Sequence, residues 1–193
     1  MIGADNQQER LQEESKEVSM ALDLKSIPPR IGYYLAGFAD GEGSFNVSFR
    51  PRKDYSLPWK ISLCFNISQK DKVILAQFKQ HLKCGTLRGR PDGVWYYEVN
   101  NFRAIVENVI PFFMRFNFLS AKKKRDFSKF RKIAKMIMEC SHLTKEGILE
   151  ITKVRREMNA GGKRRYSEEE IRKRLFQEES SETIRQASHM KGR

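Results

Sequence analysis

Glu42 stands out in this sequence because it follows a predicted helix and precedes an alternating strand. The helix is expected over about Arg30 to Ala39, and the strand begins near Ser44. The Glu42 carboxylate and the backbone carbonyl of Gly41 are oxygen ligands of the kind that a hard cation such as Mg²⁺ prefers. Hydrolysis of a phosphodiester uses a divalent ion to activate water and to neutralise charge at phosphorus. The junction is therefore a candidate site for metal-assisted hydrolysis.

The helix before Glu42 has features of a contact surface for a second helix. Pro28 and Pro29 suit its first turn, because a proline there loses no hydrogen bond. Gly37 and Gly41 are four residues apart and share one face, so another backbone could approach closely. A glycine in a helix costs about 1 kcal/mol relative to alanine, so two of them call for a reason. The alternative is a helix end capped by glycine ahead of a strand.

Alternating residues predict two strands, over 44–50 and 60–68, each with one apolar and one polar face. A helix is expected over 72–83, because its apolar residues recur at helical spacing. A hairpin follows over 86–100 and turns at 90–93, where the sequence is Arg-Pro-Asp-Gly.

Two further helices complete the predicted order. The first runs from Phe102 to Ile110 and is expected to stop at Pro111, and a longer helix starts near Ser120. The order is then α-β-β-α-β-β-α-α, which predicts an α+β fold with the sheet and the helices on opposite sides of one core. The aromatic stripe of the hairpin is assigned to that core: Trp95, Tyr97 and Val99.

Charge points to a polyanionic partner. The chain has 193 residues, a formal net charge of +13 and a pI near 9.8, which fits one domain or one domain with extensions. Such a surface attracts nucleic acid first and an anionic membrane surface second. Since no apolar run is long enough to span a bilayer, no membrane partner is expected.

The cysteines and the N-terminal residues limit the cellular compartments in which the protein is expected. Cys64, Cys84 and Cys140 form neither a disulfide framework nor a zinc-binding pattern, which fits a reducing environment. The acid-rich residues 1–14 do not resemble a secretory signal or an acid-poor transit peptide. The expected location is intracellular, in the cytoplasm, the nucleus or an organelle such as a chloroplast or mitochondrion.

The polar sides of the strands together form a candidate DNA-binding surface, called here the polar face. Serine, asparagine and arginine side chains on a sheet can reach base edges in the major groove. A solvated sheet face is the alternative, but it would mix charges more evenly. The predicted DNA-contacting residues of the polar face are Ser44, Asn46, Ser48, Arg50, Arg52, Lys53, Lys60, Ser62, Asn66, Arg88, Arg90, Tyr96 and Glu98.

Residues 35–43, Leu-Ala-Gly-Phe-Ala-Asp-Gly-Glu-Gly, resemble the signature of the LAGLIDADG homing endonucleases. Six of the nine positions fit if Glu42 is counted as aspartate. The other three are substitutions that the family tolerates: Phe38, Ala39 and Gly41. The resemblance continues in the order of elements, over about Ile31 to Glu139.

The resemblance implies an α-β-β-α-β-β-α core with a curved antiparallel four-stranded DNA-binding sheet. It also implies a metal-dependent double-strand break in a long pseudo-palindromic site, which promotes intron or intein mobility. Because the chain has one motif and hence one such carboxylate, two copies must bring their Glu42 residues together, as a homodimer. The expected dimer contacts are Tyr33, Gly37, Asp40 and Gly41.

Roles within the site also follow from the resemblance. Glu42 and the Gly41 carbonyl would bind Mg²⁺ or another divalent cation such as Mn²⁺. Gln69 matches a residue that positions the attacking water, and Lys122 or Lys123 matches a lysine that polarises it. Gln69 could equally be a polar strand end, and the lysines a phosphate-steering surface. Asp40 is expected to cap or orient rather than to bind metal.

The chain is divided into an N-terminal arm (1–28), the endonuclease domain (29–140) and a basic helical extension (141–193). The extension is expected to include a flexible basic linker over 159–165 and a capped helix from Ser167. The extensions could grip phosphates, brace the dimer or be disordered. Three alternatives stay open: pairing with a different half, an intron RNA maturase, and a sequence-specific DNA-binding protein that does not cut.

Overall fold

A four-stranded antiparallel sheet, in the order β1-β2-β4-β3, organises the computed structural model. The structure describes residues 22–52, 57–159 and 164–177. Its strands are β1 (Gly43–Pro51), β2 (Trp59–Gln69), β3 (Thr86–Gly89) and β4 (Trp95–Val99). The predicted α+β fold and both hairpin strands are confirmed.

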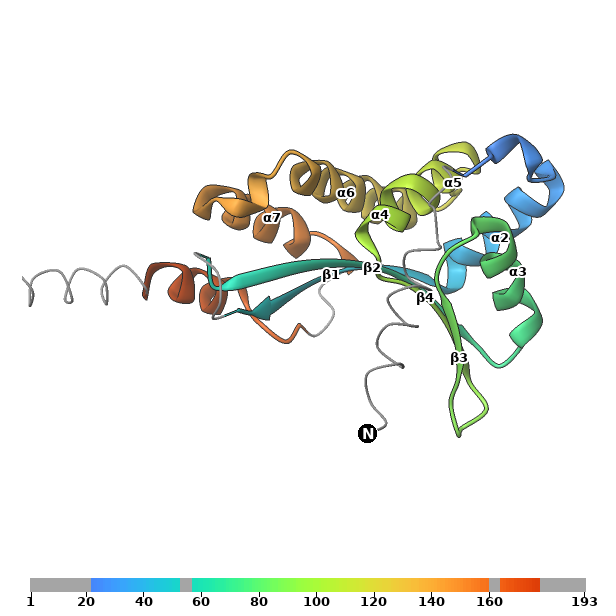
Figure 1. Ribbon diagram of the computed structural model, residues 1–193, viewed down its shortest axis with the longest axis horizontal. Helices are drawn as coiled ribbons and strands as arrows, with labels where there is room; N and C mark the ends of the chain where they lie inside the picture. The colour runs from blue at the N-terminus through green and yellow to red at the C-terminus, as the bar shows by residue number, and fades with distance from the viewer. Residues whose placement is uncertain (1–21, 53–56, 160–163, 178–193) are drawn as a thin grey trace, which may run out of the picture.

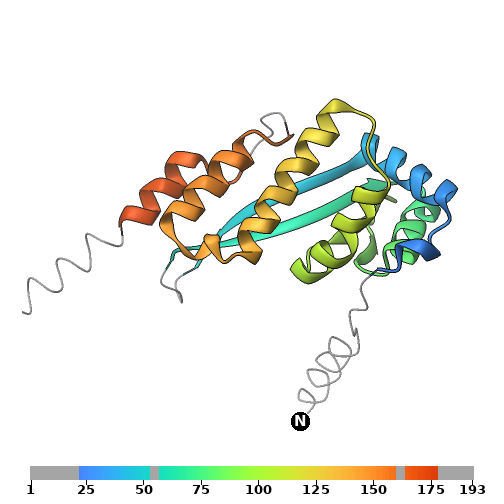
Figure 2. The ribbon, with the colours of Figure 1, turned by 90° about the horizontal axis from the view of Figure 1, so that it is seen from above.

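Helices cover one side of the sheet. Their bounds are η1 Leu24–Ser26, α2 Pro29–Glu42, α3 Lys72–Leu82, α4 Phe102–Ala104, η2 Ile105–Val109, α5 Ile110–Arg115, α6 Ala121–Met138, η3 Ser141–Leu143 and α7 Lys145–Arg156. Helices α4 to α7 lie above the long strands, and the β3–β4 hairpin extends away from them (Figure 1). Seen from above, α6 crosses β1 and β2 (Figure 2). No helix within the described ranges is long and apolar enough to cross a bilayer.

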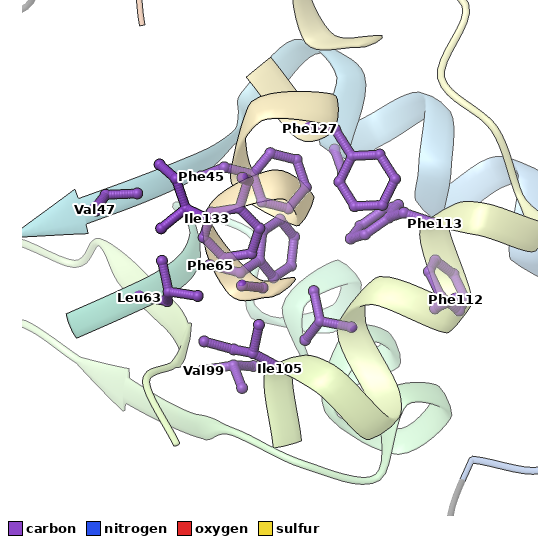
Figure 3. Packing of buried hydrophobic residues seen from close by; sticks show 14 of the residues in the cluster. Phe45, Val47, Leu63, Phe65, Val99, Ile105, Phe112, Phe113, Phe127 and Ile133 are labelled. Carbon is purple, nitrogen blue, oxygen red and sulfur yellow. The ribbon is translucent and has the colours of Figure 1, made fainter. Parts of the chain in front are cut away.

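The core is built around the ring of Phe45, which alternation along β1 directs toward α6. Phe45 is 1% exposed, and its ring centroid lies 5.0 Å from that of Phe65 and 5.0 Å from that of Phe130. Phe113 and Phe127 approach the same ring from the helices (Figure 3). These aromatic pairs fix the helical layer on the strands that carry the polar face.

The helix that begins at Phe102 continues through Pro111, so the prediction that it stops there is wrong. The turn before the proline widens into a π-helix, in which the Ile110 N–H donates to the Ile105 carbonyl. A proline lacks the N–H that bonds four residues back, and its ring clashes with that carbonyl. The wider turn relieves the clash, and the helix ends only at Arg115.

The extension from residue 141 packs on the same core as the predicted domain. Ile148 and Ile171 are fully buried in one hydrophobic cluster with the strands. The Trp59 Nε1–H donates to the Ile171 carbonyl over 3.2 Å. The predicted boundary at residue 141 therefore falls within one continuous core. The capped helix is confirmed, because Ser167 and Glu170 exchange hydrogen bonds as in a capping box.

The predicted flexible linker is wrong for its described residues. The Asn159 N–H donates to Asp126, and its side-chain amide donates to the Phe45 carbonyl over 2.9 Å. The Arg164 guanidinium donates to the carbonyls of Arg155 and Met158 at the end of α7. Residues 160–163 and the predicted N-terminal arm as far as residue 21 lie outside the described residues.

Candidate active site and nucleic-acid interface

Glu42 is the last residue of α2, and the chain turns directly from it into β1. The Gly43 N–H donates to the Ala39 carbonyl and ends the helix. A Cβ at Gly43 would lie 2.7 Å from that carbonyl oxygen, so the turn requires a glycine at the ninth motif position. Glu42 is exposed, and Ser44, two residues later, already belongs to the polar face. The carboxylate thus lies at the rim of that face.

Lys123, rather than Lys122, reaches the α2–β1 junction. Its Nζ donates to the Gly43 carbonyl, whereas the Lys122 side chain is exposed. Burial lowers the pKa of Lys123. The nearby charges of Asp40, Asp126 and Glu42 oppose that effect. Both lysines were predicted together, and the phase of α6 distinguishes them.

Asp40 joins the end of α2 to the start of α6. Its carboxylate accepts hydrogen bonds from the backbone N–H groups of Leu119 (3.0 Å) and Ser120 (2.8 Å) and from the Ser120 hydroxyl. Burial raises the pKa of Asp40, but these hydrogen bonds and the charge of Lys123 outweigh it and hold the pKa below its usual value. The side chain is occupied within its own chain, as the capping expectation requires.

Replacing Asp40 by alanine is expected to lower the free energy of unfolding by about 2 kcal/mol. The substitution leaves two backbone N–H groups at the α6 entrance without their acceptor. Urea unfolding checks this, with Asp71→Ala as a matched control. Asp71 caps α3 with a single bond to the Val73 N–H, so its loss should cost about 1 kcal/mol. An unchanged free energy of unfolding in Asp40→Ala would contradict a stabilising role for the hydrogen bonds between Asp40 and the start of α6.

Gln69 ends β2 at the same end of the sheet as Glu42. Gly43 pairs with Ile67, so Gln69 lies two residues beyond the first rung of the β1–β2 ladder. Its side-chain oxygen accepts a hydrogen bond from the Lys70 N–H over 2.8 Å. The sheet therefore brings Gln69 to the junction end, and its role with water stays a prediction.

The ladder register gathers the predicted DNA-contacting residues that belong to the strands on one face of the sheet, opposite the face that carries the buried core residues. The cross-strand pairs are Ser44 with Asn66, Ser48 with Ser62, Arg50 with Lys60, Asn66 with Glu98, and Arg88 with Tyr96. Tyr97 and Val99 are buried on the other side, and Trp95 packs partly buried beside them. The two faces predicted from alternation are confirmed, and contact of the polar face with DNA stays a prediction.

Three more residues share the polar face by register, although they were not among the predicted contacts. These are Cys64, opposite Asn46, Ser68, opposite Tyr96, and Thr86, opposite Glu98. Burial raises the pKa of the Cys64 thiol to about 12, with the charge of Glu98 adding to it. The thiol donates to Glu98 over 3.4 Å. The same alternation of polar and apolar residues that identified the neighbouring positions also places these three on the polar face.

The ends of the long strands and the hairpin carry the remaining predicted contacts. Arg90, at the β3–β4 turn, donates to the Tyr96 hydroxyl and lies 3.5 Å from Asp92. The Arg52 N–H, just past β1, donates to the Pro58 carbonyl over 2.8 Å. Lys53 lies outside the described residues.

On its outer side, α2 exposes backbone at two glycines, next to two exposed tyrosine side chains. A Cβ added at Gly37 or Gly41 would meet nothing within 4 Å. Tyr33 and Tyr34 are 59% and 60% exposed. Gly32, on the opposite side, is buried, and an added Cβ there would overlap the Phe116 ring. The two glycines that were predicted to share a face therefore leave an open track along the helix.

The donor set suits a hard cation, but one copy supplies little of it. Glu42 offers an exposed carboxylate, and the carbonyls of the last helical turn have no partner within the helix. Among the described residues, no group of three or more His, Cys, Asp or Glu side chains could hold a metal ion. A full shell would need oxygens from outside this chain, such as phosphate or a second Glu42.

Residues 35–134, more than half of the chain, match the sequence profile of the LAGLIDADG endonucleases. The chain belongs to the LAGLIDADG endonuclease family. The matched range contains residues 35–42 of the motif helix, all four strands and the α6 lysines, so it includes Glu42, Gln69 and Lys123.

Relatives of this LAGLIDADG chain include proteins named as nucleases. It is 31% identical to the homing endonuclease I-ApeII of Aeropyrum pernix over 52% of this chain and 60% of that protein. The archaeal intron-encoded homing endonuclease I-Vdi141I, solved in complex with DNA, superposes with a TM-score of 0.68 at 29% identity, covering 76% of this chain and 94% of that one. Meganuclease I-SmaMI, bound to uncleaveable DNA, gives a TM-score of 0.64 at 31% identity, covering 67% and 45%.

The curated relatives are longer than the region that they share with this chain. The chain spans between 24% and 60% of the length of those it matches. What they have in common with it is thus the LAGLIDADG region, and further activities of the longer proteins do not follow from the match.

Proposed function

We propose that this chain is a site-specific homing endonuclease that makes a divalent-metal-dependent double-strand break in DNA as a homodimer. The carrying observation is the placement of Glu42 at the rim of a basic, polar sheet face, with Lys123 beside it. A duplex lying on that face would bring a backbone phosphate to the carboxylate. I-Vdi141I was solved in complex with DNA and I-SmaMI bound to DNA, which supports DNA as the partner.

The residues divide the chemistry between them. Glu42 and the Gly41 carbonyl would hold Mg²⁺ or Mn²⁺, which supplies an activated water and positive charge at the scissile phosphate. Lys123, whose amine donates to the Gly43 carbonyl, would add positive charge beside the scissile phosphate. Gln69 would orient the attacking water from the end of β2.

The homodimer rests on one motif and one open helix face. With one motif in this sequence, a second copy would supply the second carboxylate. The α2 helices would pack across Gly37 and Gly41, an isologous contact that brings two Glu42 residues together. A two-fold protein fits a pseudo-palindromic site.

Intron mobility is the biological role that this activity would serve. One relative, 30% identical over 75% of this chain, is named as a cox1 intron-2 protein of Schizosaccharomyces pombe. A cut in an intron-free copy of a gene is the step that such mobility requires.

Selection on a randomised pseudo-palindromic duplex library tests the proposal. In Mg²⁺ the chain is expected to cut both strands at one long site, in Ca²⁺ or chelator to bind the same site without cutting. Tight, sequence-specific binding with no cut in any metal would support the DNA-binding alternative instead. Binding of intron RNA with stimulated splicing, and no DNA cleavage, would support the maturase.

A further inference from the structure

A cavity of about 380 Å³ lies at the outer edge of the sheet, between β1 on one side and residues 158–159 and 164–166 on the other. Four arginines line it, Arg50, Arg155, Arg164 and Arg165, and we call it the arginine pocket. None of its described lining residues is acidic. Four positive charges around one cavity repel one another unless an anion or solvent lies between them.

Arg155 is the least compensated of these charges. It is 7% exposed, and no carboxylate among the described residues forms an ion pair with it. Its Nη2 donates to the Tyr166 carbonyl over a long 3.4 Å, and its guanidinium lies 4.9 Å from the Phe49 ring centroid. Burial, with Arg164 second, lowers the pKa of Arg155 to about 10. A bound anion would offset the cost of burying this charge.

Arg164 is hydrogen-bonded to the backbone, whereas two other arginines of the pocket are exposed. Its Nη2 donates to three carbonyls at the end of α7, where a positive charge also favours the helix dipole. Arg50 and Arg165 are exposed at the mouth of the cavity. The planar fork of an exposed guanidinium matches phosphate oxygens in a bidentate contact.

The pocket is continuous with the polar face. Asn46 and Ser48, two predicted base-contacting residues of β1, also line it. Because β1 is an edge strand, the pocket extends that face outward rather than toward another strand. A nucleic-acid strand lying on β1 would pass its next phosphates over the cavity mouth.

We propose that the arginine pocket binds a backbone phosphate of the target duplex, outside the bases that the sheet contacts. This inference rests on the proposed function and assigns the extension a part in DNA binding. It predicts a contact that is indifferent to sequence and sensitive to salt, because phosphate contacts act through charge and counterion release.

A methylphosphonate scan tests the contact. Duplexes that carry the selected site, each with one neutral methylphosphonate in a flank, are titrated with the wild-type chain and with Arg165→Gln. At one flank position per half-site, the neutral linkage should weaken wild-type binding about tenfold. The same linkage should change binding of Arg165→Gln less than about twofold, and the salt slope of that variant should fall by about one.

Arg172→Gln is the matched control, because Arg172 is an exposed arginine of the same extension that does not line the pocket. It should show the wild-type scan. Equal losses for the wild type and Arg165→Gln at every position would overturn the pocket while leaving a binding, cutting endonuclease intact. A wild-type chain that binds no duplex would overturn both the pocket and the proposed function.

Discussion

Replacing Glu42 by glutamine is expected to reduce DNA cleavage at least about a thousandfold. The amide keeps the shape of the side chain but removes the negative charge that would hold the cation. A lost metal withdraws several kcal/mol of stabilisation from the transition state. Binding to the selected duplex should stay as tight or become tighter, since one negative charge leaves the phosphate-facing rim. Single-turnover cleavage and binding titrations in Ca²⁺ measure the two effects.

The control for this substitution is Glu139→Gln. Glu139 is an exposed carboxylate at the far end of α6, where it pairs with Lys135. Its loss should change cleavage less than about twofold, because exposed pairs contribute little. Cleavage by Glu42→Gln within tenfold of the wild-type rate would remove Glu42 from the catalytic site.

Replacing Gly37 by leucine is expected to raise the dissociation constant of the dimer about a hundredfold or more. In the single chain nothing lies within 4 Å of the new Cβ, and leucine is a better helix former, so the monomer should gain about 0.8 kcal/mol. Across a two-fold contact the extra side chains occur twice and overpack the helix seam. Analytical ultracentrifugation gives the dissociation constant, and thermal unfolding gives the monomer stability.

Gln80→Leu separates a general effect of surface leucine from an effect at the seam. Gln80 is an exposed residue of α3 and does not belong to α2. This variant should remain dimeric. If Gly37→Leu also remains fully dimeric at nanomolar concentration, the two-fold contact lies elsewhere on the chain.

Much of the fold and of the site could be predicted from local pattern. Alternation over 44–50 and 60–68 placed both long strands and their polar face, because each side of a half-buried strand has its own chemistry. The Pro-Asp-Gly turn fixed the hairpin. The motif predicted an acidic residue where a helix gives way to a strand, and the structure places Glu42 there, although α2 continues past the predicted end near Ala39 to Glu42 itself.

The predictions that were wrong or undecided concern features that packing in three dimensions determines. Pro111 is a local helix breaker, yet buried Phe112 and Phe113 keep the helix on the core, and a π-turn absorbs the proline. Basic residues near 159–165 resemble a linker in composition, and only the tertiary bonds of Asn159 and Arg164 show that these two residues are anchored. Lys122 and Lys123 are the same residue type, so the phase of α6 against β1 had to decide between them.

A mixed dimer shows whether each of two copies contributes a Glu42 to the double-strand cut. Wild-type and Glu42→Gln chains with different affinity tags are co-expressed, and the mixed dimer is purified and given a supercoiled plasmid with the selected site. We expect no linear product from the mixed dimer in Mg²⁺ and at most nicked circles, while the wild-type homodimer should linearise the plasmid. Linear product at a rate near that of the wild type would contradict the requirement for a Glu42 from each copy.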